Sequence, residues 1–551
     1  MKYTGAAILI KELIRQGVDT VFGYPGGYVI GIYDELYNYD DKISHILPAH
    51  EQGAAHAADA YARVTGKAGV VIATGGPGAT NLVTGIANAY LDSVPVVFIT
   101  GNVAVPMLGQ DSFQDIDIIG VTLPIVKHSY VVKDIKHLQK TISDAFRIAV
   151  TDRKGPVHID IPKSVQTAEF LFDTSASCDL PKLSPDICEN DLNAAIKLIN
   201  SSKCPYIYCG GGVSATDTGG EVKKLSKKIG APVGMSLMGI GSVPCSYELN
   251  LGMSGMHGRY ASIAAKSKAD LIIALGVRFS DRATGNVNEY SSNTSVLHID
   301  IDAAELGKNI RPDVSLNGDL KSILPVLVEK VQEKDNKEWV ETVKKLKEKD
   351  NDPTAHGFTP KNIIGCVNDH YGDESVVTTD VGQHQMWVAQ YYRFEKPRKL
   401  ISSGGLGAMG YGLGAAIGAS LAQGRKRTVL FTGDGSFGMN LNELATAVTQ
   451  KLPITIILFN NNTLGMVRQW QTLFFNRRYS NTTLERSTDF PAVAKAFGAA
   501  GYKADDLDVL AGILTNAPDD RPCLIECRID TDEKVLPMIP VGGTINDVIL
   551  D

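Results

Sequence analysis

The chain has 551 residues, 44% hydrophobic and 21% charged, and this length predicts two to four domains rather than one core. Its formal net charge of -7, without a block of basic residues, argues against nucleic acid as the main ligand. The eight cysteines form no CxxC pair, which fits a reducing compartment and gives no support to a cysteine metal site.

The first 19 residues lack the layout of a signal peptide. Their apolar residues recur at helical spacing with charges between them, so we expect an amphipathic helix with Thr4 as its N-cap. The sequence contains no run of about 18 apolar residues that would predict a membrane span. The expected location is therefore the cytoplasm.

Strand and helix patterns alternate over the first 175 residues. Each of four short apolar runs is followed by Gly, Pro or polar residues, which is typical of buried parallel strands. The runs cover residues 21–23, 70–73, 96–99 and 157–161. We therefore expect an α/β domain over residues 1–175.

Three segments of this first domain carry candidate functional residues. Glu51 begins a helix of small residues, where it either has a function or is simply a favourable first-turn charge. The glycine-rich turn at 75–81 can bind an anion or can serve close packing. Phe113 and Gln114 lie in a loop after a strand, where they suit a pocket wall; core packing is the alternative for Phe113.

A second α/β domain is predicted over residues 190–330, after a non-periodic linker at 176–190. Its three apolar runs end in Gly or charged residues, which suggests a nucleotide-sized site, although the usual GxGxxG fingerprint is absent. These runs cover residues 206–209, 271–276 and 296–300. The charged residues 329–352 predict a helical connector with a solvated surface.

A third α/β domain is predicted over residues 360–530. Gln383 and His384 lie where a turn enters a helix, so they and the backbone amides of that turn could meet a phosphate. The remaining residues, 531–551, form a tail that could fold over a site as a lid.

The segment at 428–461 has the pattern strand, helix, strand, with the helix expected over 441–451. Parallel pairing would bring Asp434 and Asn461 together at the carboxyl ends of the strands, where open α/β sheets bind ligands. A carboxylate and an amide oxygen suit Mg2+, and the flanking glycines admit a phosphate. We therefore predict a clamp for Mg2+ and a diphosphate, with a helix-capping Asp as the alternative.

Several motifs together point to one family. They are FGYPGG (22–27), HEQGAAHAADAYAR (50–63), GPGATN (76–81), DSFQD (111–115), RFSDRATGN (278–286), TDVGQHQMW (379–387), GDGSFGMN (433–440) and NNNTLGMVRQWQ (460–471). GDG followed by NN resembles the thiamine-diphosphate motif. The whole set, over about residues 4–545, resembles the FAD-containing catalytic large subunit of acetohydroxyacid synthase, also called acetolactate synthase.

The resemblance implies three Rossmann-like, doubly wound parallel-sheet domains of the thiamine-diphosphate enzyme fold. The first would bind the pyrimidine ring, the second FAD, and the third the diphosphate with Mg2+. It also implies decarboxylation of pyruvate and ligation to a second 2-oxoacid, the first common step of branched-chain amino-acid biosynthesis. Pyruvate as acceptor gives 2-acetolactate, and 2-oxobutyrate gives 2-aceto-2-hydroxybutyrate.

The resemblance also implies partners. The family's cofactor lies between the first domain of one subunit and the third domain of another, so a homodimer or homotetramer is expected. A small regulatory subunit is a further partner of the family.

Site residues can be carried over by motif. Glu51 would exchange a proton with the pyrimidine ring as the central catalytic residue, and Gln114 and Phe113 would lie near the reacting centre. Metal ligands would be Asp434, Asn461 and the backbone carbonyl of Thr463. Further thiamine-diphosphate contacts would be Gly382, Gln383, His384, Met409, Gly435, Ser436 and Met466.

Two further groups follow from the same resemblance. The substrate site would include Phe113, Gln114, Lys163 and Trp470, with Trp470 favouring the larger 2-oxobutyrate acceptor. FAD, which does no net redox chemistry in this family, would contact Arg153, Gly211, His257, Arg278, Asp281, Arg282, Asp300 and Asp319.

Alternative functions share parts of this pattern. A flavin-linked pyruvate oxidase or another thiamine-diphosphate lyase would also carry Glu51 and the GDG–NN pair. A non-catalytic paralogue is disfavoured because Glu51, Asp434 and Asn461 are all present. Glyoxylate carboligase is disfavoured because it lacks a glutamate at the position of Glu51.

Overall fold

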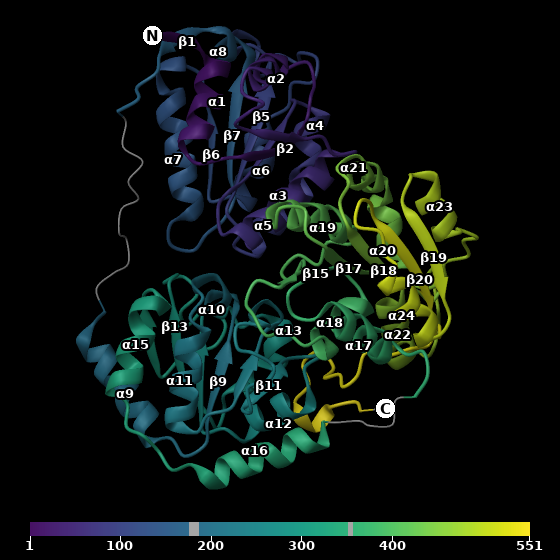
Figure 1. Cartoon of the computed structure of the whole chain (residues 1–551). Helices are drawn as coiled ribbons and strands as arrows, with labels where there is room; N and C mark the ends of the chain where they lie inside the picture. Colours follow the sequence, from purple (N-terminus) through teal and green to yellow (C-terminus); the bar gives the residue numbers. More distant parts are fainter. Residues whose placement is uncertain (176–186, 351–355, 551) are drawn as a thin grey trace.

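Three parallel sheets of six strands each organise the chain into three lobes (Figure 1). The computed structural model describes residues 1–175, 187–350 and 356–550. The three-domain α/β fold class expected from the sequence is thereby confirmed. Residues 176–186 of the expected linker, and the end of the expected connector at 351–352, lie outside the described residues.

The first lobe is a sheet with helices on both faces. Helices α1 (Gly5–Arg15), α2 (Ile30–Tyr37) and α7 (Leu138–Val150) pack on one face, while α3 (Glu51–Thr65) and α5 (Val83–Leu91) pack on the other. Because both faces are covered, the central strands are mostly apolar, and three of their polar side chains, Thr100, His158 and Asp160, are buried and hydrogen-bonded to one another. The strand order is β3 (Ser44–Ile46), β2 (Thr20–Tyr24), β4 (Gly69–Ala73), β5 (Val96–Asn102), β7 (Val157–Pro162) and β6 (His128–Val131).

Local sequence signals explain the start of this lobe. The Thr4 hydroxyl accepts a hydrogen bond from the Ala7 amide at 3.1 Å, so Thr4 is the predicted N-cap of α1. Strand β1 (Lys2–Thr4) pairs antiparallel with β8 (Glu169–Leu171), which holds the first residues beside the end of the lobe.

The central lobe repeats this arrangement. Helices α9 (Glu189–Ser201), α11 (Gly219–Ile229) and α15 (Leu320–Lys330) cover one face, and α12 (Tyr260–Lys268) covers the other. The strand order is β11 (Asn250–Met253), β10 (Val233–Met235), β9 (Pro205–Cys209), β12 (Leu271–Leu275), β13 (Ser295–Asp300) and β14 (Val314–Asn317).

The helix α16 (Lys337–Lys349) corrects the expectation of a solvated connector. Its Trp339, Val343 and Leu346 are buried in the core of the central lobe, and the Trp339 ring nitrogen donates to the Pro205 carbonyl at 3.0 Å. The many charges of this helix occupy one face and leave a narrow apolar stripe on the other. The segment is therefore part of the central lobe.

The third lobe contains the predicted clamp. Helices α17 (Pro360–Tyr371), α18 (Gln383–Tyr391) and α24 (Leu507–Thr515) pack on one face, and α19 (Tyr411–Ala422), α21 (Leu444–Thr449) and α23 (Phe490–Ala496) on the other. The strand order is β16 (Leu400–Ile401), β15 (Val376–Thr379), β17 (Thr428–Gly433), β18 (Ile454–Asn460), β20 (Cys523–Arg528) and β19 (Ala500–Ala504).

One helix of this lobe begins earlier than the sequence predicts. Helix α20 (Asp434–Asn440) follows β17 directly, a 3-10 turn at Leu441–Glu443 comes next, and α21 completes the expected helical segment. A Cβ at Gly435 would approach a methyl carbon of Leu464 to 2.8 Å, so the missing side chain admits close packing there. That packing outweighs the low helix propensity of glycine.

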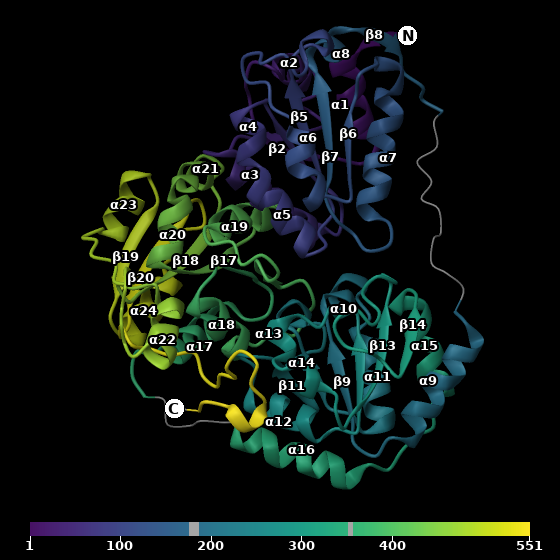
Figure 2. The ribbon, with the colours of Figure 1, turned by 180° about the vertical axis from the view of Figure 1, so that it is seen from behind.

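Helices α3 and α19 join the first lobe to the third, and they lie side by side in both ribbon views (Figure 2). Their backbones approach closely: a Cβ at Gly418 would lie 1.9 Å from the Ala57 carbonyl oxygen, and one at Gly414 would lie 2.9 Å from the Gly53 oxygen. Small residues are therefore required along this contact.

The C-terminal tail crosses from the third lobe to the central lobe. Trp387 donates to the Lys534 carbonyl at 3.1 Å, and further along the Ile539 amide donates to the Met256 carbonyl at 2.8 Å. Val535 and Met538 are fully buried. The tail predicted as a lid is thus packed against both lobes.

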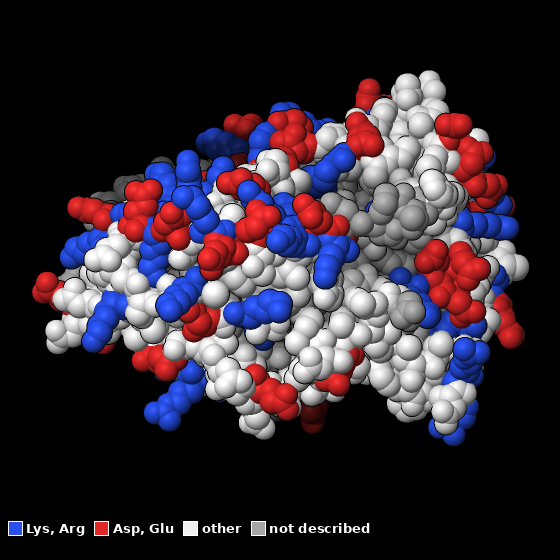
Figure 3. Space-filling view, turned by 90° about the horizontal axis from the view of Figure 1, so that it is seen from below, with Lys and Arg blue, Asp and Glu red and all other residues white. Residues whose placement is uncertain are grey.

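Two further features concern the charge distribution on the surface and the length of the apolar helices. On the face shown in Figure 3, Lys and Arg side chains are interspersed with Asp and Glu, so that face presents no continuous basic surface. Within the described residues, no helix combines the length and apolar character needed to cross a bilayer.

Candidate active site

Asp434 and Asn461 follow the carboxyl ends of two paired strands. Strands β17 and β18 pair in parallel, with Gly433 opposite Phe459, so both residues leave the sheet at the same edge. Each is less than 10% exposed, at 5% and 7%. Burial raises the pKa of the Asp434 carboxyl to about 6, against hydrogen bonds from the Gly435 and Asn462 amides that lower it.

The donor set suits a hard cation held partly by phosphate. Among the described residues, no three His, Cys, Asp or Glu side chains are grouped as a metal site. Asp434 therefore offers a single buried carboxylate. The other two oxygens come from the segment after β18: the Asn461 amide oxygen and, two residues later, the Thr463 carbonyl. Mg2+ typically takes one or two protein carboxylates and completes its shell with phosphate oxygens and water.

His384 supplies an unsatisfied group beside this edge. Its ring is 5% exposed, and in the described part of the chain its Nε2 has no hydrogen-bond partner. Burial lowers the pKa of the imidazole to about 3, so the ring is neutral near pH 7. An unpaired buried polar atom costs roughly 1–3 kcal/mol, which a ligand group that pairs with Nε2 would offset.

Glycines keep the space around these groups open. A Cβ at Gly433 would lie 3.1 Å from the His384 Nδ1, and a Cβ at Gly465 would lie 1.9 Å from the Gln383 Oε1. Gln383 in turn accepts a hydrogen bond from the Asn461 Nδ2 at 3.3 Å. The residues present therefore fit an anion with a bound cation at this edge.

Met409 and Ser436 border the same place. A Cβ at Gly435 would lie 3.9 Å from the Met409 Cε, and the Ser436 hydroxyl accepts from the Gly410 amide at 3.3 Å. Met466 lies in α22 (Gly465–Phe474) and packs against the core of the lobe. The third lobe thus gathers ten of the predicted residues: Gly382, Gln383, His384, Met409, Asp434, Gly435, Ser436, Asn461, Thr463 and Met466.

Glu51 belongs to a second group, in the first lobe. It is the first residue of α3, and its Oε2 accepts from the Asn81 Nδ2 at 2.9 Å. A Cβ at Gly78 would lie 3.2 Å from its other oxygen, and one at Gly76 would lie 2.7 Å from the Gln114 Cβ. The glycine-rich turn therefore connects Glu51 with Gln114.

Phe113 and Lys163 lie further out on this lobe. Phe113 is 80% exposed, so the core-packing interpretation is wrong for the described chain. Lys163 is exposed at the start of α8 (Lys163–Thr167), directly after β7.

Sequence reasoning missed Glu443. This carboxylate is 1% exposed in the third lobe, yet it accepts from the backbone amides of Ala49 at 3.1 Å and His50 at 3.0 Å. A Cβ at Gly53 would lie 2.0 Å from its Oε1. Glu443 therefore anchors the start of α3, where Glu51 lies; its position among apolar residues was the only signal.

The predicted FAD residues gather at the carboxyl ends of the central strands. Gly211 starts α10 (Gly211–Thr216) after β9, Asp300 ends β13, and Asp319 caps α15 after β14. The segment after β12 carries Arg278 and then α13 (Asp281–Thr284), which begins with Asp281 and Arg282. Gly276, just before them, has φ +57, and its Cβ would lie 2.6 Å from the Gly212 Cα, which admits only glycine.

Buried polar atoms favour a ligand at this edge. Burial raises the pKa of the Asp300 carboxyl to about 6. His257 is buried, its pKa is lowered to about 4 by burial, and its Nδ1 finds no partner among the described residues. Arg153, from the first lobe, pairs with Asp302 at 3.1 Å and with Glu305 at 2.6 Å. These residues fit a nucleotide cofactor, with Arg153 already engaged by carboxylates.

Trp470 reaches the central lobe from α22. The guanidinium carbon of Arg282 lies 5.8 Å from its ring centroid, and the Phe474 ring lies 5.2 Å away. The Asp281 and Arg282 side chains are 76% and 61% exposed. The third lobe's aromatic pair therefore faces a charged and accessible segment of the central lobe.

Comparison with known proteins matches all three lobes. The thiamine pyrophosphate enzyme N-terminal TPP binding domain matches residues 3–121, the central domain residues 192–327, and the C-terminal TPP binding domain residues 380–527. The acetolactate synthase large subunit of Lactococcus lactis is 43% identical over 98% of this chain and 95% of its own length. The isozyme 1 large subunit of Escherichia coli is 42% identical over 100% and 98%.

A third relative, the acetolactate synthase large subunit of Corynebacterium glutamicum, is 42% identical over 99% of this chain and 90% of its own length. This identity extends along nearly the whole chain. Each of the three lobes also matches a domain of thiamine pyrophosphate enzymes. The chain belongs to the family of thiamine-pyrophosphate-dependent acetolactate synthase large subunits.

Proposed function

We propose that this chain decarboxylates pyruvate and ligates the remaining two-carbon unit to a second 2-oxoacid. Pyruvate as the acceptor yields 2-acetolactate, and 2-oxobutyrate yields 2-aceto-2-hydroxybutyrate. The observation that carries the proposal is the strand edge where Asp434, Asn461 and the unpartnered His384 Nε2 converge. Thiamine diphosphate, when bound, supplies a nucleophilic carbon and accepts the electron pair that carbon dioxide leaves behind.

In this proposal the third lobe binds and orients the cofactor's tail. Asp434, Asn461 and the Thr463 carbonyl would hold Mg2+, whose charge would offset that of the diphosphate. His384, Gly382, Gln383, Gly435 and Ser436 would line the cradle around the phosphate oxygens. Met409 and Met466 offer apolar contacts on the side of the reacting carbon.

Glu51 holds the proton of the proposed reaction. Its Oε2 is oriented by Asn81 at 2.9 Å, which leaves Oε1 to share a proton with a ring nitrogen of the pyrimidine. Gln114 and Phe113 lie near the reacting centre, and Lys163 and Trp470 complete the proposed substrate site.

The same proposal assigns partners and a second cofactor. In the family, the cofactor lies between the first domain of one subunit and the third domain of another, so we place Glu51 of one copy and Asp434 of another around one site, in a homodimer or homotetramer. FAD would bind at the central strand ends with a structural role. Because the relatives are named large subunits, a small regulatory subunit is included among the partners.

Mg2+ affinity should depend on pH through Asp434. Its carboxyl has a pKa near 6 in the metal-free fold, and only the charged form binds Mg2+ well. We expect the apparent affinity for Mg2+ to be constant above about pH 7 and to fall up to tenfold per pH unit below about pH 6. Titration calorimetry with thiamine diphosphate present measures this. An affinity that stays constant from pH 8 to pH 5 would contradict the role of Asp434.

Acceptor choice should depend on Trp470. We expect Trp470→Leu to lower the ratio of 2-oxobutyrate to pyruvate incorporation by roughly tenfold, because a lost aromatic contact with one extra methylene is worth about 1–3 kcal/mol. Competition between the two acceptors, read by product analysis, gives the ratio. Phe474→Leu, which changes the ring packed on Trp470, is the matched control and should shift the ratio less. An unchanged ratio in Trp470→Leu would remove this role.

Product analysis tests the overall proposal. Purified protein with Mg2+, thiamine diphosphate and FAD should convert pyruvate to acetolactate, and should form the aceto-hydroxybutyrate product when 2-oxobutyrate is added. A flavin spectrum should show FAD that stays oxidised during turnover. Stoichiometric consumption of oxygen or a quinone without acetolactate would instead identify a pyruvate oxidase.

A further inference from the structure

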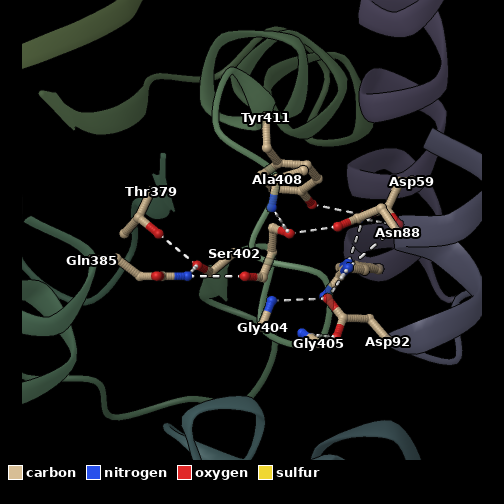
Figure 4. A network of polar contacts seen from close by, with 12 residues as sticks. Asp59, Asn88, Asp92, Thr379, Gln385, Ser402, Gly404, Gly405, Ala408 and Tyr411 are labelled. Carbon is tan, nitrogen blue, oxygen red and sulfur yellow. Dashed lines mark hydrogen bonds and ion pairs between the residues drawn. The ribbon is translucent and has the colours of Figure 1, made fainter. Parts of the chain in front are cut away.

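A network of buried side chains connects the first lobe with the turn over residues 403–410, called here the Met409 turn, whose Gly404 and Gly405 are exposed (Figure 4). The turn connects β16 with α19 and carries Met409, whose Cε borders Gly435 in the candidate cradle. Its partners come from α3 and α5, on the other side of the lobe boundary. The cradle is thus held partly from outside its own lobe.

Asp92, at the end of α5, holds the start of the turn. Its Oδ2 accepts from the Gly404 amide at 3.0 Å, and its Oδ1 accepts from the Gly405 amide at 2.7 Å. The Asp92 side chain is fully buried. Since both oxygens must be met at once, one carboxylate fixes the orientation of two consecutive peptide groups.

Arg63 of α3 in turn holds Asp92. Its Nη2 donates to the Asp92 Oδ2 at 2.9 Å, and its Nε donates to the Asp59 Oδ1 at 2.7 Å. Burial disfavours the charge on Arg63, but Asp59, Tyr411 and Asp92 outweigh it and raise its pKa well above the usual value. The guanidinium therefore stays charged and keeps both carboxylates in place.

The other end of the turn is closed by the same network. The Ser403 hydroxyl donates to the Asn88 Oδ1 at 2.6 Å and accepts from the Ala408 amide at 2.9 Å. The Tyr411 hydroxyl, where α19 begins, donates to the Asp59 Oδ1 at 2.7 Å. Residues on both sides of Met409 are thereby tied to first-lobe side chains.

The charges of this network do not balance. Two carboxylates, Asp59 and Asp92, share one guanidinium, so one negative charge remains buried. Such an arrangement adds little to stability compared with apolar packing of the same volume. The excess charge is met by donors that include the Gly404 and Gly405 amides. The turn itself therefore supplies part of what the buried carboxylates require.

We propose that Asp92 is a positioning residue for the thiamine diphosphate site: held by Arg63, it sets the Met409 turn in the geometry that binds the cofactor. The inference rests on the proposed function, because it assumes that this cradle receives thiamine diphosphate. It adds a residue of the first lobe that touches no cofactor and acts through Gly404 and Gly405.

Cofactor binding to Asp92→Asn tests this inference. Asparagine keeps the volume, but its amide group places a donor against one of the two backbone N–H groups. We expect thiamine diphosphate to bind about tenfold more weakly to the full-length variant, by titration calorimetry with excess Mg2+, because a charge-assisted hydrogen bond is lost. At saturating cofactor, kcat should recover to within about twofold, because the chemistry is untouched.

Glu12→Gln is the matched control. Glu12 is also fully buried in the first lobe and pairs with Arg15, and it lies on α1, on the sheet face opposite α3 and α5. It should lower the melting temperature without changing cofactor affinity. Equal affinity in Asp92→Asn and wild type, or equal losses in Asp92→Asn and Glu12→Gln, would overturn the inference.

A second variant and the wild type complete the design. Ser403→Ala removes the hydroxyl that links the Ala408 amide of the turn to Asn88 and should weaken cofactor binding about fivefold. It decides the question if Asp92→Asn does not fold, since an unchanged affinity would then overturn the inference. A wild type that binds no thiamine diphosphate would defeat the proposed function instead.

Discussion

We expect Glu51→Gln to lose pyruvate decarboxylation by about 10²-fold or more while thiamine diphosphate still binds. Glutamine keeps the length of the side chain and an oxygen for the Asn81 amide, which lies 2.9 Å from the native carboxylate. It cannot give up or take on the proton that the pyrimidine ring requires. The loss should therefore fall on turnover rather than on affinity.

Two measurements separate these quantities. Release of carbon dioxide from pyruvate at saturating cofactor reports turnover, and titration calorimetry reports the dissociation constant of thiamine diphosphate. Glu35→Gln removes a carboxylate of the same lobe that, among the described residues, accepts from Thr4 and Asn38, so it should leave both quantities unchanged. Wild-type turnover in Glu51→Gln would refute the assignment of Glu51.

The second large effect is expected from Asp434→Asn. Removing the buried carboxylate leaves Mg2+ without a charged protein ligand, so thiamine diphosphate should bind on the order of 100-fold more weakly. Activity at ordinary cofactor concentrations should disappear. Excess Mg2+ should restore only part of it, because the remaining oxygens belong to neutral groups.

Asp434→Asn should lower cofactor affinity and activity, but it should not lower the stability of the metal-free protein. The pKa of Asp434 is raised above its unfolded value, so its contribution to stability is fully present below about pH 4 and is lost as the pH rises through about 6. At pH 8 the metal-free wild type therefore carries an unfavourable buried charge, which Asp434→Asn removes. Thermal unfolding without Mg2+ should show a variant at least as stable as wild type. A clear loss of stability would mean that Asp434 has a structural role instead.

Much of the fold follows from short patterns in the sequence. The runs at 70–73, 96–99 and 428–432 are buried strands because a sheet covered on both faces favours apolar side chains; only the threonines at the two ends of the last run are polar, and both are buried. Thr4 caps its helix because the hydroxyl meets a free backbone amide locally. Asp434 and Asn461 meet at one edge because parallel pairing places the ends of neighbouring strands together.

Predictions were less accurate where the structure of a segment depends on its tertiary contacts. The charges of α16 indicated a solvated helix, but Trp339, Val343 and Leu346 are buried against the central lobe. The sequence predicted a helix only from Leu441, yet α20 begins at Asp434, and the close packing of Gly435 on Leu464 needs a position without a side chain there. Local helix propensity contributes less to stability than such packing does.

The sequence by itself determined the three α/β domains and the residue types of the clamp, because strand periodicity and strand-end motifs are local properties of the chain. Only the tertiary structure decided that Glu443 anchors the start of α3 and that Asp92 binds the Gly404 and Gly405 amides. These contacts join residues more than 300 positions apart, and nothing in the local sequence of either partner indicates them before the lobes meet.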